Sequence, residues 1–169
     1  MSLEKLQFLE KLYKKAQYPV QLLKQSAQVP YPVLIVGLSD EKSTEGQIVT
    51  FTYFPPEETE FESIDCLQIF TQLPFEITDF PSSEVWRYVS ILNRKLPFGT
   101  FNYAEESHCF EFRHIVTAPL SEEINPDFYK ELLELTHSLL DMFTPILSAL
   151  YSQKISLSDA LSQSALGIE

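Results

Sequence analysis

Three residues near the end of the sequence have the spacing of metal ligands on a helix. Glu134, His137 and Asp141 are separated so that a helix would place them on one face. A Glu-x-x-His pair on a helix serves di-iron sites, but such sites need a second copy of the pair and two further glutamates. The sequence offers neither, so we expect a solvent-facing polar stripe instead of a metal site.

A second group of carboxylates follows a predicted strand near the middle of the chain. Glu57, Glu58, Glu60 and Glu62 come just before Asp65. Carboxylate oxygens are ligands that calcium prefers, but this run lacks the glycine turn and the alternating ligands of an EF-hand loop. We therefore expect an acidic loop that holds no metal.

Nucleophilic and phosphate-binding motifs are also missing. No Gly-x-Ser-x-Gly elbow occurs, and the four glycines lie too far apart to form a phosphate-binding loop. Cys66 and Cys109 each lie in a strand-like run without an adjacent base, so we expect reduced thiols that serve in packing. His114 shares a strand face with apolar residues and is expected to be partly buried. The sequence thus predicts no catalytic residue, no cofactor and no metal.

The charge of the chain limits its partners. The 169 residues carry a net charge of −12. Such a chain is repelled by the phosphates of nucleic acids and by an anionic membrane surface. The start of the sequence has no signal-peptide pattern, and the longest apolar run, Val33–Leu38, is far shorter than the roughly 20 residues of a membrane span. We expect a cytoplasmic protein that binds neither nucleic acid nor membrane.

The elements that would position any site follow from the hydrophobic periodicity. Strands are predicted over 33–38, 47–54, 65–77, 100–104 and 108–118. Helices are predicted over 2–17, 19–27, 83–95, 125–153 and 156–164. Ser83 is expected to cap the helix over 83–95, and Ser156 the last helix. This order predicts one α+β domain over 1–169, with about five antiparallel strands, helices packed on the sheet and the order α-β-β-β-α-β-β-α. An N-terminal helical extension is expected at about 1–32.

The predicted helix over 83–95 has an unusually wide apolar face. Its core stripe leaves Trp86 and Ile91 on opposite flanks. One small domain has no second layer to cover both flanks, so we expect these residues to anchor a homodimer. The alternative is cover within the chain, by residues 18–32.

Aromatic residues gather in the hairpin that follows this helix. Phe101 lies on the first predicted strand, and Phe110 and Phe112 share one face of the second. Arg113 lies on the opposite face of that strand. We consider these four residues a candidate surface for a ligand or a partner.

The segment Val85–Tyr103 contains Leu92-Asn93 at the end of a predicted helix and then Gly99 before an aromatic strand. This segment resembles the middle of YbjN-like proteins, and the aromatic-x-Phe-Arg pattern that ends at Arg113, followed by a long apolar helix, fits the same family. The resemblance covers about residues 33–152 and implies the type III secretion chaperone-like fold. Secretion chaperones of this fold are small, acidic homodimers that hold an unfolded partner segment.

These observations predict a non-enzymatic protein-binding module, chaperone-like or a regulatory adaptor. It would hold a protein or peptide segment by sheet-edge pairing or in an apolar groove. The alternative is a small-ligand-binding regulatory protein whose pocket is lined by Phe101, Phe110 and Phe112. Both hypotheses follow from the lack of catalytic motifs and from the aromatic content, which is 13 Phe, 8 Tyr and one Trp.

Overall fold

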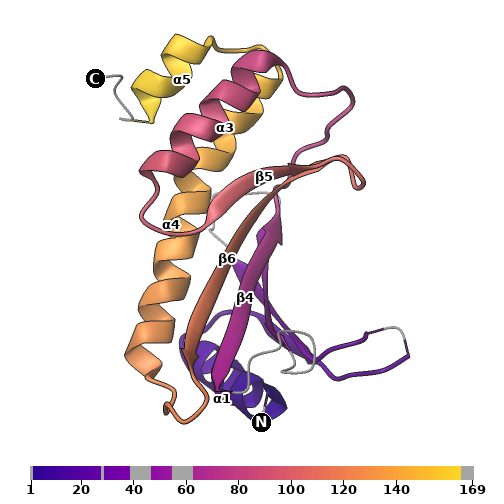
Figure 1. The fold of residues 1–169 in the computed structure, drawn as a ribbon, viewed down its shortest axis with the longest axis vertical. Coiled ribbons are helices and arrows are strands. Elements are labelled where there is room, and N and C mark those ends of the chain that lie inside the picture. The colour runs from indigo at the N-terminus through magenta and orange to yellow at the C-terminus, as the bar shows by residue number, and fades with distance from the viewer. Residues whose placement is uncertain (1, 28, 39–46, 55–62, 165–169) are drawn as a thin grey trace. The chain divides into compact units, whose positions relative to one another are not determined.

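A computed structural model of the chain describes residues 2–27, 29–38, 47–54 and 63–164. The described residues form four helices and six strands (Figure 1). Their bounds are α1 Ser2–Lys15, β1 Val20–Leu23, β2 Val33–Leu38, β3 Gln47–Phe54, β4 Ile64–Gln72, α3 Ser83–Lys95, β5 Thr100–Ala104, β6 Cys109–Pro119, α4 Pro126–Tyr151 and α5 Leu157–Gln163. The strands form an antiparallel sheet in the order β1-β2-β3-β4-β6-β5. The predicted α+β class is confirmed, with six strands where about five were expected.

The chain divides into two compact units, each built from two segments. Unit 1 takes its residues from 1–71 and 113–133, and unit 2 from 72–112 and 134–169. The acidic run that includes Glu57 and Glu62 lies outside the described residues.

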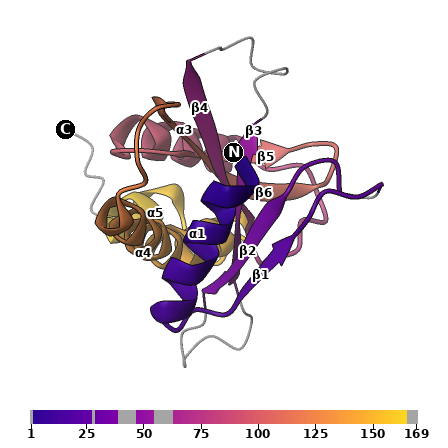
Figure 2. The same ribbon diagram turned by 90° about the horizontal axis from the view of Figure 1, so that it is seen from below.

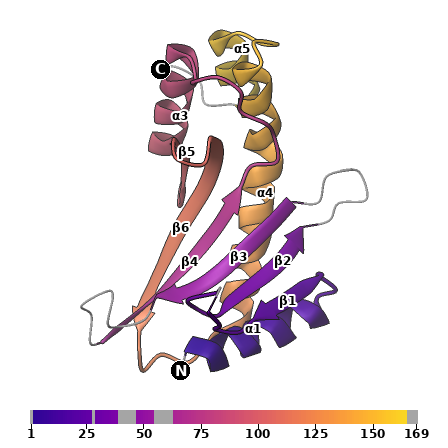
Figure 3. The ribbon, with the colours of Figure 1, turned by 90° about the vertical axis from the view of Figure 1, so that its right-hand side faces the viewer.

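Unit 1 has its core between α1 and one face of its strands. Burial alternates along β2 and β3, and Leu34 lies opposite Phe51, which in turn lies opposite Ile69. All three side chains are fully buried. The ring of Tyr13 on α1 packs 5.4 Å from the ring of Phe51, and Figures 2 and 3 show α1 lying beside β1 and β2. The two-residue period of a strand thus places these three side chains on the same face of the sheet.

The helix expected over 19–27 is wrong, because this segment contains strand β1. Gln17, which follows the end of α1 at Lys15, has a positive φ of 67°, and the chain then turns back along β2. Val20 pairs opposite Val36, and Leu22 opposite Leu34. A short apolar run does not distinguish a strand from a helix, and here the backbone groups along β2 supply partners for a strand. The expected extension at 1–32 is thus a helix and an edge strand.

Unit 2 contains α3, β5 and α5, and Figure 1 shows α3 beside α5. The Tyr88 hydroxyl lies 2.7 Å from the Ser164 hydroxyl and joins α3 to the end of α5. Ser156 caps α5 as predicted, in a capping box with Asp159. The cap of α3 is Ser82 instead of the expected Ser83, because the Ser82 hydroxyl accepts the Val85 N–H at 3.4 Å.

Several predicted boundaries shift, and the largest shift is at the end of β4. The strand expected over 65–77 ends as β4 at Gln72, because Pro74 has no N–H for the ladder and the chain leaves the sheet there. The helix expected over 125–153 is α4, and the Asn125 side chain accepts the N–H groups of Asp127 and Phe128 at 3.0 and 3.3 Å.

Candidate functional site

Three aromatic rings form a partly exposed cluster on unit 2. Phe80 precedes α3, Trp86 lies on α3 and Tyr103 lies on β5. Their ring centroids are 5.7 to 6.0 Å apart, and Tyr103 meets both other rings edge to face. Phe80 is 64% exposed and Trp86 38% exposed. We call Phe80, Trp86 and Tyr103 the aromatic cluster.

The aromatic cluster rests on a fixed base. The Tyr103 ring packs 5.4 Å from the buried Phe110 ring, and its hydroxyl lies 3.2 Å from His108 Nδ1. Phe80 lies two residues before the Ser82 cap and contacts the fourth residue of α3, Trp86. This contact is close to a hydrophobic staple, which fixes the angle at which a chain enters a helix. The rings are therefore held in place before any partner arrives.

Asn93 joins α3 to the edge strand β5. Its side-chain amide donates to the Phe101 carbonyl and accepts the Phe101 N–H, both at 2.8 Å. The Asn93 side chain thus satisfies the backbone N–H and carbonyl of Phe101 on the edge of β5 that does not face β6. A side chain that hydrogen-bonds to these edge groups prevents another strand from pairing with them. This arrangement disfavours sheet-edge pairing as the way in which unit 2 binds a partner at Phe101.

A groove of about 440 Å³ begins at Phe80 of the aromatic cluster and is also lined by Ser82, the cap of α3. Tyr151 organises its wall, because its hydroxyl accepts the N–H groups of Thr78 and Asp79 at 2.9 Å each. The same hydroxyl donates to the Asp79 carbonyl at 3.0 Å. The loop before Phe80 is therefore anchored to the end of α4.

The structure separates the predicted site residues into three environments. Trp86 is exposed on α3, and Ile91 is half-buried on the same helix. Phe101, Phe110 and Phe112 are at most 1% exposed and lie in the core of unit 2, where the Phe101 and Phe112 rings are 5.2 Å apart. These three rings offer no surface to a ligand or a partner in this structure.

Arg113 is exposed, and its Nε donates to Gln68 Oε1 at 2.7 Å. Sequence reasoning did not assign Phe80 and Tyr103 to a surface. The staple-like spacing of Phe80 and Trp86 is the one signal in the sequence that pairs two members of the aromatic cluster.

The structure places the histidines and cysteines that the sequence analysis considered for chemistry. His137 Nε2 lies 3.3 Å from Asp141 Oδ2, an i,i+4 pair on α4. Among the described residues no group of three or more His, Cys, Asp or Glu side chains is close enough to hold a metal ion. Burial lowers the pKa of His114, which favours its neutral form. Cys66 and Cys109 are free thiols, one buried and one half-buried.

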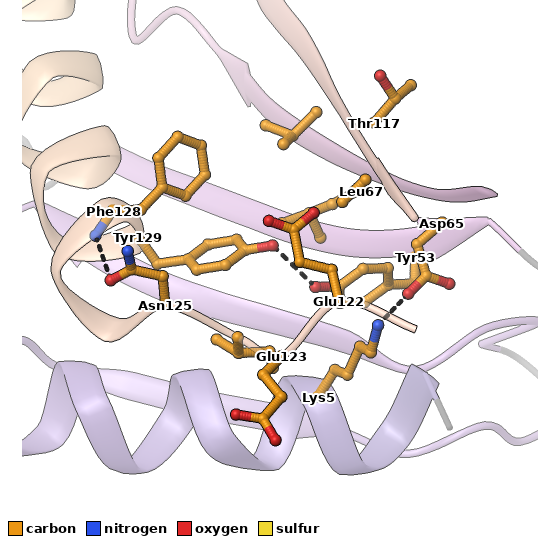
Figure 4. A pocket seen from close by; sticks show the side chains of 13 residues that line it. Lys5, Tyr53, Asp65, Leu67, Thr117, Glu122, Glu123, Asn125, Phe128 and Tyr129 are labelled. Carbon is orange, nitrogen blue, oxygen red and sulfur yellow. Dashed lines mark hydrogen bonds and ion pairs between the residues drawn. The ribbon is translucent and has the colours of Figure 1, made fainter. Parts of the chain in front are cut away.

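Unit 1 contains a separate cavity of about 210 Å³ (Figure 4). Lys5 forms an ion pair with Asp65 at this cavity, and Lys5 Nζ also lies 5.9 Å from the centre of the Tyr53 ring. The Tyr53 and Tyr129 hydroxyls are 3.4 Å apart. Burial raises the pKa of Tyr53 far above the ordinary value, so its hydroxyl stays protonated and serves in hydrogen bonding.

Replacing Lys5 with methionine is expected to lower the free energy of unfolding by about 2 kcal/mol. The Lys5 and Asp65 side chains are only 15% and 13% exposed, so the cost lies between that of a surface pair and that of a buried one. Urea denaturation measures the change. Lys14→Met is the matched control on α1, because the Lys14 side chain is 57% exposed in its ion pair with Glu10. This substitution should lower the free energy of unfolding by less than about 0.5 kcal/mol. Equal losses in the two variants would contradict the prediction.

The fold and these surfaces define an α+β protein with an antiparallel sheet, an exposed aromatic cluster on one unit and a small cavity lined by carboxylates and aromatic rings in the other. No family model, no curated protein and no solved structure shows significant similarity to the chain. Across the part of the chain that the structure describes, no helix has the length and apolar character needed to cross a membrane.

Proposed function

We propose that this chain is a non-enzymatic protein-binding module, chaperone-like or a regulatory adaptor, and that the aromatic cluster is its binding face. The observation that carries the proposal is the exposure of Phe80 and Trp86 beside Tyr103 in a fixed arrangement. Large aromatic residues are enriched at the centres of protein interfaces, because they bury much apolar area at a low cost in side-chain entropy. A rigid base reduces the ordering cost of binding further.

The first partner that we propose for this face is a second copy of the chain. Trp86 lies on a flank of α3 that the core of unit 2 does not use, and the other two rings of the cluster extend this apolar area. A two-fold contact would bring two identical clusters together. Each chain carries a net charge of −12, so added salt should strengthen the association by screening the repulsion between copies.

Light scattering behind a sizing column tests this proposal at tens of micromolar protein. We expect the mass of two chains for the native protein and of one chain for Trp86→Glu. Arg87→Glu is the control, since it places the same carboxylate on the exposed side of α3 away from the core. Circular dichroism should show that all three proteins are folded. A native protein with the mass of one chain would overturn the dimer, and a Trp86→Glu dimer would place the contact elsewhere.

The absence of enzymatic activity is tested separately, with a panel of generic hydrolase substrates. We expect no turnover above background from the pure protein. Robust turnover that a point variant abolishes would overturn the non-enzymatic proposal.

We also propose membership of the YbjN-like family and a cytoplasmic location. Three residues of the resembling segment have structural roles that support the family proposal. Leu92 is fully buried on α3, Asn93 binds the backbone of β5, and Gly99 has a positive φ of 68° before β5.

The alternative of a small-ligand-binding regulatory protein loses support at Phe101, Phe110 and Phe112, because these rings are at most 1% exposed.

A further inference from the structure

We propose that the cavity of unit 1 binds a small organic ammonium ion. This site is independent of the aromatic cluster and shares no residue with it. The cavity is lined by the carboxylates of Asp65, Glu122 and Glu123 and by the rings of Tyr53, Phe128 and Tyr129. Carboxylates beside aromatic faces are the groups that recognise an alkylammonium cation, through charge and through the ring quadrupole.

One end of the cavity already holds an ammonium group in this way. The Lys5 side chain reaches from α1 to the Asp65 carboxylate, and its Nζ lies 5.9 Å from the centre of the Tyr53 ring (Figure 4). The chain's own lysine therefore shows that this lining accommodates a carboxylate-bound ammonium against an aromatic ring. Both side chains of the ion pair are largely buried, so the site also removes water from the cation.

The other end offers the same chemistry without a cation. Glu122 lies in the loop before α4, beside Tyr129, and Phe128 is 44% exposed at the cavity. Within the described part of the chain, neither Glu122 nor Glu123 forms an ion pair. Lys5 balances Asp65, which leaves the lining with two uncompensated negative charges. The negative charge of this lining repels an anion and does not attract a neutral molecule.

The size of the cavity selects a small ligand. Its volume of about 210 Å³ is below the range of roughly 300–1,000 Å³ typical of sites for drug-sized molecules. A short alkyl diamine fits both the volume and the charge, with one ammonium at Glu122 and the alkyl chain against Phe128. Figure 4 shows the Glu122 side chain extending beside the Tyr129 hydroxyl, whereas the Glu123 side chain points away from it. We therefore assign the main contact to Glu122.

Calorimetric titration of the full chain with putrescine tests the proposal. We expect saturable binding with one ligand per chain, weakened by added salt because the contact is between charges. Butane-1,4-diol has the same chain length without charge, and succinate has the opposite charge, so neither should bind. Nα-acetyl-lysine methylamide presents the same ammonium on a lysine side chain. If this compound binds more tightly than putrescine, the ammonium group that the cavity binds belongs to a peptide. If putrescine binds more tightly, it belongs to a free amine.

Three glutamine variants locate the site. Glu122→Gln should weaken putrescine binding at least fivefold, and Glu123→Gln should weaken it less. Glu131→Gln, at an exposed position of α4 outside the cavity, should leave it unchanged. Circular dichroism spectra and melting temperatures check that each variant is folded. Equal binding of the diol, no saturable binding of putrescine, or an unchanged affinity in Glu122→Gln would overturn the proposal, and none of these results bears on the aromatic cluster.

Discussion

Gly99→Ala is expected to lower the free energy of unfolding by about 3 kcal/mol, the largest effect of any single methyl group that we predict. Gly99 has a φ of +68°, where a side chain is strained, and it precedes β5 directly. A Cβ at this position would lie 2.3 Å from Cζ and 2.5 Å from Cε2 of Phe112. The Phe112 ring has no room to retreat, because it is fully buried and packs against Phe98 and Phe101.

Urea denaturation followed by circular dichroism measures this change, with Gly37→Ala as the matched control. A Cβ at Gly37 would lie 3.5 Å from the nearest atom, Cβ of Pro19, which is an ordinary contact. Gly37 lies in β2, and its alanine variant should differ from the native protein by less than about 1 kcal/mol. The account of Gly99 fails if its alanine variant is as stable as that of Gly37.

Asn93→Ala should cost about 2 to 3 kcal/mol of the free energy of unfolding. The substitution removes both hydrogen bonds to Phe101 and leaves a backbone N–H and a carbonyl without their partner beside a buried side chain. It also uncovers an edge of β5, so we expect larger species to form as the protein concentration rises. Urea denaturation gives the stability, and dynamic light scattering follows the association.

Ser90→Ala is the control for this substitution. Ser90 is exposed on the same helix, and alanine is a good helix former, so the variant should be as stable as the native protein or slightly more stable. An Asn93→Ala variant that unfolds at the same urea concentration as Ser90→Ala would show that the amide does not hold β5 to α3. An Asn93→Ala variant that is less stable but does not associate would support the contribution of the two hydrogen bonds to stability. It would contradict the proposal that Asn93 keeps the edge of β5 from pairing with another chain.

Local patterns were sufficient for several elements. The apolar run over 33–38 and the β-branched and aromatic residues over 47–54 predicted both strands with the bounds that the structure has. The helix over 83–95 was also predicted with its observed bounds. Ser156 was recognised as a cap, because its chemistry depends only on neighbours within one turn of the helix.

Strand β1 was missed because its formation depends on a partner strand. Val20–Leu23 is too short for its periodicity to distinguish a strand from a helix. Its pairing with β2, and the turn that Gln17 makes with a φ of 67°, become visible only when both segments are placed in the sheet. A hydrogen-bonding partner is a property of the fold and not of the four residues.

The sequence by itself determined the α+β class, the bounds of several elements, the acidic charge and the flank position of Trp86. It did not determine which aromatic residues face solvent. Phe101 and Phe80 are the same residue type, yet one is fully buried and the other is 64% exposed. The pairing of Lys5 with Asp65 across 60 residues was equally hidden. Only the tertiary structure decides such cases, because burial and charge pairing depend on which distant segments pack together, and a local pattern carries no record of that packing.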